Sequence, residues 1–378
     1  MLFCNARIFT PAGWISGGFR VENGRFSEFI PGLSSGGIDL HSSDVLPGLV
    51  DIHTHGAAGA DFSDGDTEEL SRMAACLAAH GVTSFAPATM TLPFNKLAEA
   101  MRTAAAFRRY RPKSCARLIG VNMEGPFFSE KKKGAQNPAY LKNPDFDVFK
   151  DLYDGCGGLI RLVDLAPELP GAAEFAAKAS RLCTVSAAHT DASYEEAAAF
   201  FDAGATHVTH LFNAIPPLHH REPGVIGAAS ERENVFAELI SDGLHVHPGA
   251  VRMAFKLFPE RICLISDSLR CCGMPDGAYE LGGQTVYLKD GAARLSDGTL
   301  AGSAANLFSC MKNAVSFGIP KETAIRAASL LPAQAVGADG DVGAIEIGKC
   351  ADFLVVSPDL MLKAVYIGGV RIDSFMVY

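Results

Sequence analysis

The sequence predicts an α/β protein: a (β/α)8 TIM-like barrel together with a small discontinuous β-sandwich domain formed by the two termini. Between residues 47 and 335, about eight apolar strand candidates alternate with helical stretches. The flanking segments 1–46 and 336–378 contain short β-like stretches instead. Eight alternating units are typical of a closed parallel barrel. An open doubly wound sheet is the structural alternative.

The composition is that of a globular protein. Of the 378 residues, 48% are hydrophobic and 20% are charged, which is enough for an ordinary core. The net charge of -9 argues against nucleic acid or an anionic membrane as a partner, because both require a positive surface. The first residues show no signal-peptide pattern, and no apolar run reaches the length of a membrane span, so we expect a cytoplasmic location.

The N-terminal segment and the first strand are separated by a change of pattern. Turn-forming pairs such as Asn23-Gly24 divide residues 1–46 into short segments, which predicts β-structure. The first barrel strand is expected from residue 48, and a helix at 67–80 is expected to end at Gly81. The remaining strand candidates are 82–88, 118–123, 159–166, 184–188, 207–211, 237–241 and 262–266.

The later elements follow from turn and capping patterns. Ser193 and Glu196 form a capping-box pair for a helix that Gly204 ends. Asp290-Gly291 predicts a hairpin turn after the eighth strand, and helices are expected at about 303–317 and 321–330. The β-rich segment 343–378 is expected to pair with the N-terminal strands.

Polar side chains follow several predicted strands at the point where each strand ends. They are His53 and His55 (strand one), Glu124 (strand three), His189 (strand five), His210 (strand six) and Asp267 (strand eight). In a barrel, the C-terminal ends of all strands meet at one mouth. A single His-x-His pair does not define a metal site, but buried titratable groups need partners, and here each would supply the others.

This ligand set predicts metal-dependent hydrolysis. Imidazole and carboxylate groups suit zinc best, and iron or manganese as alternatives, with one or two ions per subunit. Such an ion lowers the pKa of a water molecule and polarises a carbonyl group, which favours cleavage of an amide, an ester or a related bond. Glu124 can bridge two ions, and Asp267 is placed to act as a base.

Short motifs distributed over the whole chain carry a family resemblance. They are 46–56 (LPGLVDIHTHG), 123–127 (MEGPF), 133–138 (KGAQNP), 209–214 (THLFNA), 221–224 (REPG), 242–245 (DGLH), 300–303 (LAGS) and 343–353 (GAIEIGKCADF). As a set they resemble the amidohydrolase superfamily and, within it, the N-acetylglucosamine-6-phosphate deacetylase family. The resemblance implies hydrolysis of N-acetylglucosamine 6-phosphate, a small phosphorylated amino sugar, to glucosamine 6-phosphate and acetate.

The resemblance also implies roles for individual residues. Glu124, His189 and His210 would bind the main metal, while His53 and His55 match the variant of the family with a second ion. Asp267 would be the general acid and base. The residues implied around the substrate are Ala135, Gln136, Asn213, Ala214, Arg221, His245, Leu300, Ala301 and Gly302. Arg221 and His245 are natural donors to a phosphate. The family further suggests a homodimer.

Three alternatives stay open. The same reaction on N-acetylgalactosamine 6-phosphate differs only in a hydroxyl epimer. A cyclic-amide hydrolase is disfavoured because residues 159–166 contain no lysine that could bridge two metals. A purely structural metal site is disfavoured because it would have no use for Asp267. The loop residues Lys131 to Lys133 and His219-His220 are expected to be mainly solvated.

Overall fold

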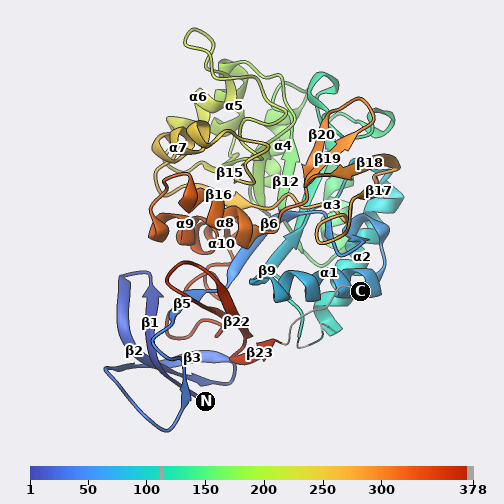
Figure 1. Ribbon diagram of the computed structural model, residues 1–378. Coiled ribbons are helices and arrows are strands. Elements are labelled where there is room, and N and C mark those ends of the chain that lie inside the picture. Colours follow the sequence, from blue (N-terminus) through green and yellow to red (C-terminus); the bar gives the residue numbers. More distant parts are fainter. Residues whose placement is uncertain (111, 113, 373–378) are drawn as a thin grey trace.

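A large α/β barrel and a smaller β-sheet domain make up the molecule (Figure 1). The computed structural model describes residues 1–110, 112 and 114–372. No helix in this described part of the chain combines the length and the apolar character needed to cross a membrane.

Eight parallel strands follow one another around the barrel in chain order. They are β6 (Leu49–Thr54), β9 (Val82–Pro87), β11 (Val121–Phe127), β12 (Ile160–Leu165), β13 (Thr184–Ala187), β14 (His207–Val208), β15 (Phe236–Ile240) and β16 (Ile262–Ile265). They form two sheets, β10-β9-β6 and β11 to β16, where β10 (Arg117–Leu118) lies just before β11 in the chain. A bridge between Ala88 and Asn122 joins the sheets on one side, and the amide of Asp267 donates to the His53 carbonyl at 2.9 Å on the other. The predicted eight-stranded arrangement is therefore confirmed.

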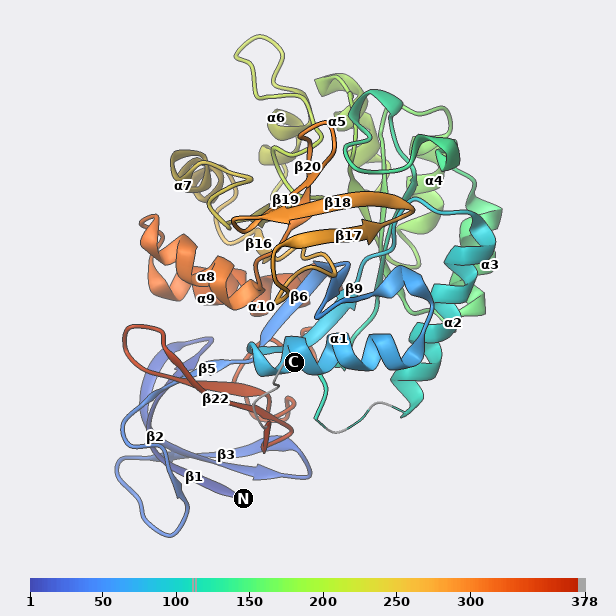
Figure 2. The ribbon, with the colours of Figure 1, turned by 45° about the vertical axis from the view of Figure 1, so that its right-hand side comes forward.

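Helices cover the outside of the barrel (Figures 1 and 2). They are α1 (Thr67–Ala79), α2 (Phe94–Tyr110), α3 (Phe146–Gly155), α4 (Ala172–Ala179), α5 (Tyr194–Asp202), α6 (Gly224–Ser230), α7 (Pro248–Leu257), α8 (Leu307–Ser316), α9 (Lys321–Ala327) and α10 (Leu330–Ala335). The capping box of Ser193 and Glu196 at the start of α5 is present as predicted. The helix predicted at 321–330 is instead divided into α9 and α10, because the backbone of Ser329 has φ -139° and ψ -75°, outside the helical region.

Two small antiparallel sheets border the carboxyl ends of the strands. One consists of β17 (Gly277–Leu281), β18 (Gln284–Lys289), β19 (Ala292–Leu295) and β20 (Leu300–Ser303). Lys289 pairs with Ala292, so the predicted turn at Asp290-Gly291 is confirmed. The other pairs β7 (Gly56–Ala57) with β8 (Ala60–Asp61). Short 3-10 helices occur at η1 (Phe62–Asp64), η2 (Glu130–Lys132) and η3 (Pro138–Tyr140).

The smaller domain joins both ends of the chain in one sheet. Its strands are β1 (Leu2–Thr10), β2 (Gly13–Glu22), β3 (Arg25–Pro31), β4 (Ile38–Asp39), β5 (Asp44–Pro47), β21 (Phe353–Val356), β22 (Leu362–Ile367) and β23 (Val370–Ile372). β21 pairs antiparallel with β5, so the C-terminal segment does pair with the N-terminal strands. Phe3, Phe19, Phe26, Phe353 and Tyr366 pack in the core of this domain. Its division from the barrel at 46–47 and 335–336 stays a prediction.

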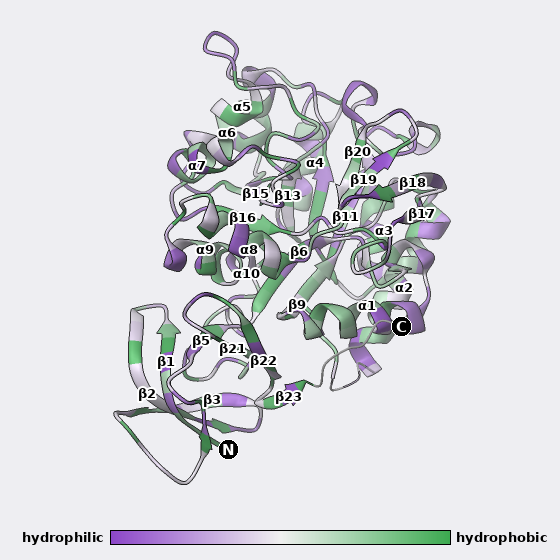
Figure 3. Cartoon of the chain, viewed as in Figure 1, coloured by the Kyte–Doolittle hydropathy of each residue, from purple (hydrophilic) through white to green (hydrophobic). Residues whose placement is uncertain are grey.

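The single tryptophan lies where the small domain meets the barrel. Trp14 of β2 donates its indole N–H to Glu322 Oε1 of α9 at 2.8 Å. The guanidinium of Arg7 and the ammonium of Lys321 lie 4.2 Å and 5.4 Å from its ring centroid. Asp44 binds both of these cations, at 2.8 Å and 2.7 Å. Figure 3 shows that the barrel strands beside this junction are hydrophobic and that the distant loops are hydrophilic.

Candidate active site

Four histidine side chains surround the carboxylate of Glu124 at the barrel mouth. The Oε1 atom lies 3.1 Å from His189 Nε2, 3.3 Å from His210 Nε2 and 3.6 Å from His53 Nε2. The Oε2 atom lies 3.3 Å from His55 Nε2. All five residues are buried. The structure therefore brings together all five of the metal ligands proposed from the sequence, although β11 extends three residues beyond Glu124 rather than ending there.

Left-handed backbone turns direct three of the site's side chains inward. His189, His210 and Asp267 follow β13, β14 and β16, and their φ angles are 44°, 30° and 48°. Residues other than glycine adopt this conformation at a cost in energy, so the surrounding structure must hold it. Two backbone hydrogen bonds hold Asp267 in this conformation. Its amide donates to the His53 carbonyl, and its carbonyl accepts from the Ser303 amide.

Hydrogen bonds at the second ring nitrogen orient three of the imidazoles. His53 Nδ1 lies 2.8 Å from Glu238 Oε2, His189 Nδ1 lies 2.9 Å from the Lys132 carbonyl, and His210 Nδ1 lies 3.1 Å from the Asn213 carbonyl. Because an oxygen acceptor favours a proton on Nδ1, Nε2 is the nitrogen of each ring that is left to bind a metal beside Glu124. This is the tautomer that a metal-binding histidine needs.

The residues fit a divalent metal. Two sets of ligand atoms, one from His53, His55 and Glu124 and one from Glu124, His189 and His210, each lie within 4.8 Å of one another. His53 Nε2 is fully buried and has no hydrogen-bond partner among the described residues, so a cation at this position would satisfy it. Imidazole and carboxylate ligands suit first-row divalent ions.

The charges at the mouth also favour a cation. Burial opposes the charged form of His55, yet its hydrogen bonds to Asp267 and Glu124 raise its pKa to about 10. Burial likewise opposes ionisation of Glu124, but the charge of His53 and the hydrogen bonds from the other histidines hold its pKa well below the usual range. Both carboxylates thus attract positive charge strongly.

A cavity of about 330 Å³ opens above the ligands. Eight of the nine substrate residues proposed from the sequence line it: Ala135, Gln136, Asn213, Ala214, His245, Leu300, Ala301 and Gly302. The Gln136 side chain donates to Glu124 Oε2 at 2.8 Å and accepts from the Thr91 amide at 2.7 Å. His245 Nδ1 lies 2.7 Å from Asp242 Oδ2. Asp267 lines the same cavity, with Oδ1 3.3 Å from His55 Nε2.

Arg221 is the one proposed substrate residue that lies elsewhere. It is exposed on the loop between β14 and α6, beside His219 and His220, and it lines a different cavity with Asp191, Glu195 and Glu231. This loop projects beyond the rest of the barrel (Figures 1 and 2). Within this single chain, Arg221 does not share a cavity with Glu124.

Several residues at the site were not proposed from the sequence. Lys131 and Lys132 line the cavity, as do Met90, Gly134 and Thr299. The side chain of Lys131 is 79% exposed, as expected from the sequence, and its ammonium group lies 3.0 Å from Asp191 Oδ2. Glu238 is completely buried behind His53. A glutamate between the apolar residues Ala237 and Leu239 of the strand candidate 237–241 is a pattern that could have revealed it.

The fold and the ligand set together define the amidohydrolase class of metal-dependent hydrolases. The model of the amidohydrolase family matches residues 45–372. The N-acetylglucosamine-6-phosphate deacetylase of Bacillus subtilis is 38% identical over 322 residues, which cover 84% of this chain and 81% of that protein. The N-acetylgalactosamine-6-phosphate deacetylase of Escherichia coli O157:H7 is 33% identical over 98% of both chains.

A solved structure of a deacetylase is also similar to this chain. A mutant N-acetyl-D-glucosamine-6-phosphate deacetylase from Mycobacterium smegmatis, in complex with N-acetyl-D-glucosamine-6-phosphate, superposes with a TM-score of 0.93 at 32% identity. The match covers 98% of this chain and 99% of that one. The chain belongs to the amidohydrolase family and, within it, to the N-acetylglucosamine-6-phosphate deacetylases.

Proposed function

We propose that the protein hydrolyses the N-acetyl group of N-acetylglucosamine 6-phosphate, giving glucosamine 6-phosphate and acetate, with the help of a bound divalent metal. The observation that carries this proposal is the single cavity in which Glu124 and its histidines meet His245, Asn213 and the backbone of 300–302. The acetamide can lie over the ligands while the sugar phosphate extends toward the cationic side chains. The names of the relatives support the same substrate.

We assign the metal to Glu124, His189 and His210, and a second ion to His53, His55 and Glu124. A metal bound there lowers the pKa of a water molecule and polarises the acetamide carbonyl. The mixed nitrogen and oxygen ligands support zinc as the native ion, with iron or manganese as alternatives.

Asp267 is assigned the proton transfers of the reaction. As a buried carboxylate beside His55, it takes a proton from the attacking water and returns that proton to the departing amine nitrogen. The C–N bond breaks, the acetyl carbon gains the water oxygen, and the products are an amine and acetate. Gln136 holds Glu124 in place through their 2.8 Å hydrogen bond.

His245, Lys131 and Lys132 are assigned to the substrate phosphate, because these three basic side chains line the cavity that contains the ligands. We assign Arg221 to the phosphate site of a second copy of the chain in a homodimer. Its position on a projecting loop, outside its own cavity, supports this arrangement. A cytoplasmic location fits an enzyme that acts on a phosphorylated sugar.

The proposed function is tested by acetate release from N-acetylglucosamine 6-phosphate, compared with its galactose epimer and with the unphosphorylated sugar. Each substrate is measured before chelation, after chelation and after zinc, iron or manganese is restored. We expect metal-dependent turnover with a preference for the phosphorylated glucosamine derivative. No release from any of the three substrates would contradict the proposal.

N-acetylgalactosamine 6-phosphate is the second candidate substrate, since the E. coli relative that bears this activity in its name matches 98% of both chains. The two sugars differ only in the orientation of one hydroxyl group. A higher kcat/KM for the galactose epimer in the same assay would replace the first candidate with the second.

The role of Arg221 is tested by subunit mixing. Arg221→Ala should raise KM for the phosphorylated sugar by about tenfold or more and leave KM for the unphosphorylated sugar nearly unchanged. Mixed dimers of Arg221→Ala with the inactive Asp267→Asn chain should then recover a normal KM, because the partner supplies Arg221 to the intact active site. Unrestored KM in mixed dimers would place Arg221 in its own subunit's site.

A further inference from the structure

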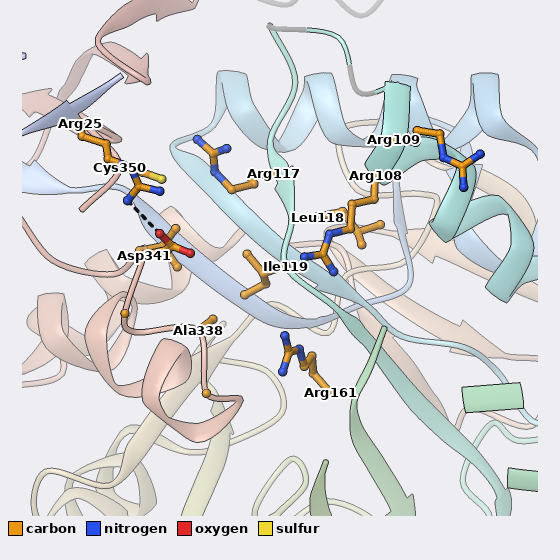
Figure 4. A pocket seen from close by; sticks show the side chains of 13 residues that line it. Arg25, Arg108, Arg109, Arg117, Leu118, Ile119, Arg161, Ala338, Asp341 and Cys350 are labelled. Atoms are coloured by element: carbon orange, nitrogen blue, oxygen red, sulfur yellow. Dashed lines mark hydrogen bonds and ion pairs between the residues drawn. The ribbon is translucent and has the colours of Figure 1, made fainter. Parts of the chain in front are cut away.

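Another cavity, of about 480 Å³, is lined by five arginines: Arg25, Arg108, Arg109, Arg117 and Arg161 (Figure 4). Asp341 is the one acidic side chain among its described lining residues. Such a concentration of positive charge contrasts with the net charge of -9 of the whole chain. The volume lies within the range of pockets that hold small ligands.

This cavity is separate from the active site. Arg117 is the first residue of β10 and Arg161 is the second residue of β12, so both lie at the amino ends of parallel strands. The catalytic ligands lie toward the carboxyl ends. On β12 the residue paired with Glu124 is Asp164, three positions beyond Arg161, which corresponds to about 10 Å along the strand.

Most of the positive charge in this cavity has no counter-charge. Arg25 is bound by Asp341 at 2.8 Å, and Arg117 lies at a longer 3.4 Å from Asp352. Within residues 1–110 and 114–372, no carboxylate is close enough to form an ion pair with Arg108, Arg109 or Arg161. The Nε atoms of Arg117 and Arg161 are buried and lack a hydrogen-bond partner in the same part of the chain.

The arginines that line this cavity come from separate elements and border one space. Arg108, Arg117 and Arg161 come from α2, β10 and β12, and Figure 4 shows their side chains around Leu118 and Ile119, with Arg25 held by Asp341 and Arg109 at the edge. Arginines that served only to bind carboxylates of the fold would have those carboxylates beside them. Buried donors without partners are rare in folded proteins and indicate a missing acceptor.

Two features of the backbone keep this cavity open. A Cβ atom at Gly120 would lie 2.1 Å from Arg161 Cγ, so only glycine leaves room for the Arg161 side chain to lie across the strand. Gly337, Ala338 and Gly340 also line the cavity and carry at most a methyl group, which leaves the space unfilled. A Cβ at Gly337 or Gly340 would meet no atom within 4 Å.

We propose that this cavity is a second anion site, which binds the phosphate group of a small molecule through Arg108, Arg117 and Arg161. Guanidinium groups suit a tetrahedral dianion, because each offers two parallel N–H donors to its oxygens, and these three line the same cavity. The cavity is larger than a phosphate ion, so it can also hold the organic part of a phosphate ester. The partner chemistry is thus inorganic phosphate or a phosphorylated metabolite.

The test is a calorimetric titration of the full-length, metal-loaded protein with inorganic phosphate. The wild-type protein should bind phosphate in two classes of site, at the active site and in the arginine cavity. Arg108→Gln and Arg161→Gln should each weaken one class by about tenfold or more while kcat/KM stays unchanged. His245→Gln should weaken only the other class.

Arg102→Gln is the matched control, since Arg102 is exposed on α2 like Arg108 but does not line the cavity. Arg102→Gln should leave the affinity for phosphate unchanged in both classes of site. Arg108 is also exposed, so its substitution tests the proposal even if Arg161→Gln does not fold. The proposal is overturned if neither arginine variant alters phosphate binding, or if Arg102→Gln weakens it equally.

Competition in the His245→Gln protein identifies the source of the phosphate. Displacement of inorganic phosphate by glucosamine 6-phosphate at equal concentration assigns the site to a phosphorylated sugar. Retention of inorganic phosphate assigns it to the free ion. Because these readouts come from a variant with a weakened active site, they do not depend on the deacetylase activity.

Discussion

Asp267 faces both histidines of the His-x-His pair, with Oδ1 3.3 Å from His55 Nε2 and 3.6 Å from His53 Nε2. Asp267→Asn keeps the size and shape of this side chain but removes the proton acceptor. We expect kcat to fall by roughly 10²- to 10⁴-fold, while the metal content per subunit, measured by elemental analysis, stays the same. Asp290→Asn, in an exposed hairpin turn, is the control. Near-normal kcat with full metal content would exclude Asp267 as the acid and base.

The assignment of His245 to the substrate phosphate predicts a pH dependence of KM. Burial alone would lower its pKa, but the hydrogen bond and charge of Asp242 outweigh burial and raise the pKa above the ordinary value. The cationic form therefore persists to higher pH than for a free histidine, and its contribution to phosphate binding is lost as pH rises through the raised pKa. KM for the phosphorylated sugar should rise over that interval, and KM for the unphosphorylated sugar should not.

Asp242→Asn tests the cause of this shift. The variant lacks the charge that raises the pKa of His245, so the rise in KM should begin at lower pH than in the wild type. The measurement is KM against pH for both sugars in both proteins. Superimposable profiles would show that His245 does not act on the phosphate through its charge.

Single residues also mark what the sequence could and could not predict. The meeting of the five proposed metal ligands could be predicted, because strand ends in a parallel barrel converge and position along the chain was sufficient. Arg221 was predicted for the same cavity, but the path of a long loop is not determined by local pattern, and the loop carries Arg221 outward. Glu238 was missed because it lies within β15 rather than at its end.

At the scale of elements, β20 supports the mouth directly. A bridge pairs Ser303 with Ser268, next to Asp267, and Leu300 to Gly302 line the substrate cavity. Gly302 has φ 112°, and a Cβ there would lie 2.8 Å from Leu269 Cδ2 and 3.1 Å from the Asp267 carbonyl oxygen. Only glycine allows β20 to approach this closely.

Gly302→Ala should therefore push β20 away from Asp267 and reduce kcat/KM by about tenfold or more. Gly298→Ala is the matched control, because Gly298 also has positive φ, 89°, but a Cβ there would meet nothing within 4 Å. Both variants carry backbone strain, and only Gly302→Ala carries the clash. Equal losses of kcat/KM in the two variants would mean that strain, and not the position of β20, controls activity.

The elements themselves were predictable where apolar runs were long. All eight barrel strands were found, because buried parallel strands are continuous hydrophobic runs. β17 and β20 were not predicted: most residues of β17 are exposed and β20 alternates, so neither carries a continuous apolar run. The break at Ser329 was missed as well, because serine is tolerated within helices and Pro332, in the first turn of α10, was not used as a sign of a helix start.

At the scale of the whole molecule, the small domain and the barrel are tightly connected. β5 ends at Pro47 and β6 begins at Leu49, so a single residue separates a strand of one domain from a strand of the other. Leu46 packs in the barrel core, whereas Val45 packs in the core of the small domain. This connection leaves little room for independent motion.

We therefore expect one cooperative unfolding transition. Trp14 is the only tryptophan and lies at the junction, so its emission reports on the contact between the two domains. In a urea titration, the midpoint from tryptophan emission should equal the midpoint from far-UV circular dichroism. A tryptophan transition at clearly lower urea would show that the small domain separates first.

Of the features that depend on the whole fold, the sequence predicted the pairing of the termini but not the arginine cavity. The pairing of the two termini could be predicted, since both segments are β-rich and neither could bury a core alone. The arginine cavity could not, because Arg108, Arg117 and Arg161 are spread over 54 positions and meet only when α2, β10 and β12 fold together.

The two ligand sets at the mouth share Glu124 and no other residue. His53 lies in β6 and His55 directly follows that strand, whereas His189 and His210 follow β13 and β14. Substitutions of His53 and His55 therefore leave the second set of ligands complete. The second ion proposed for this site can therefore be lost through substitutions in one short segment, while Glu124, His189 and His210 keep the first ligand set intact. Glu124 belongs to both ligand sets, so a substitution at this position would remove a ligand from both proposed metal sites at once.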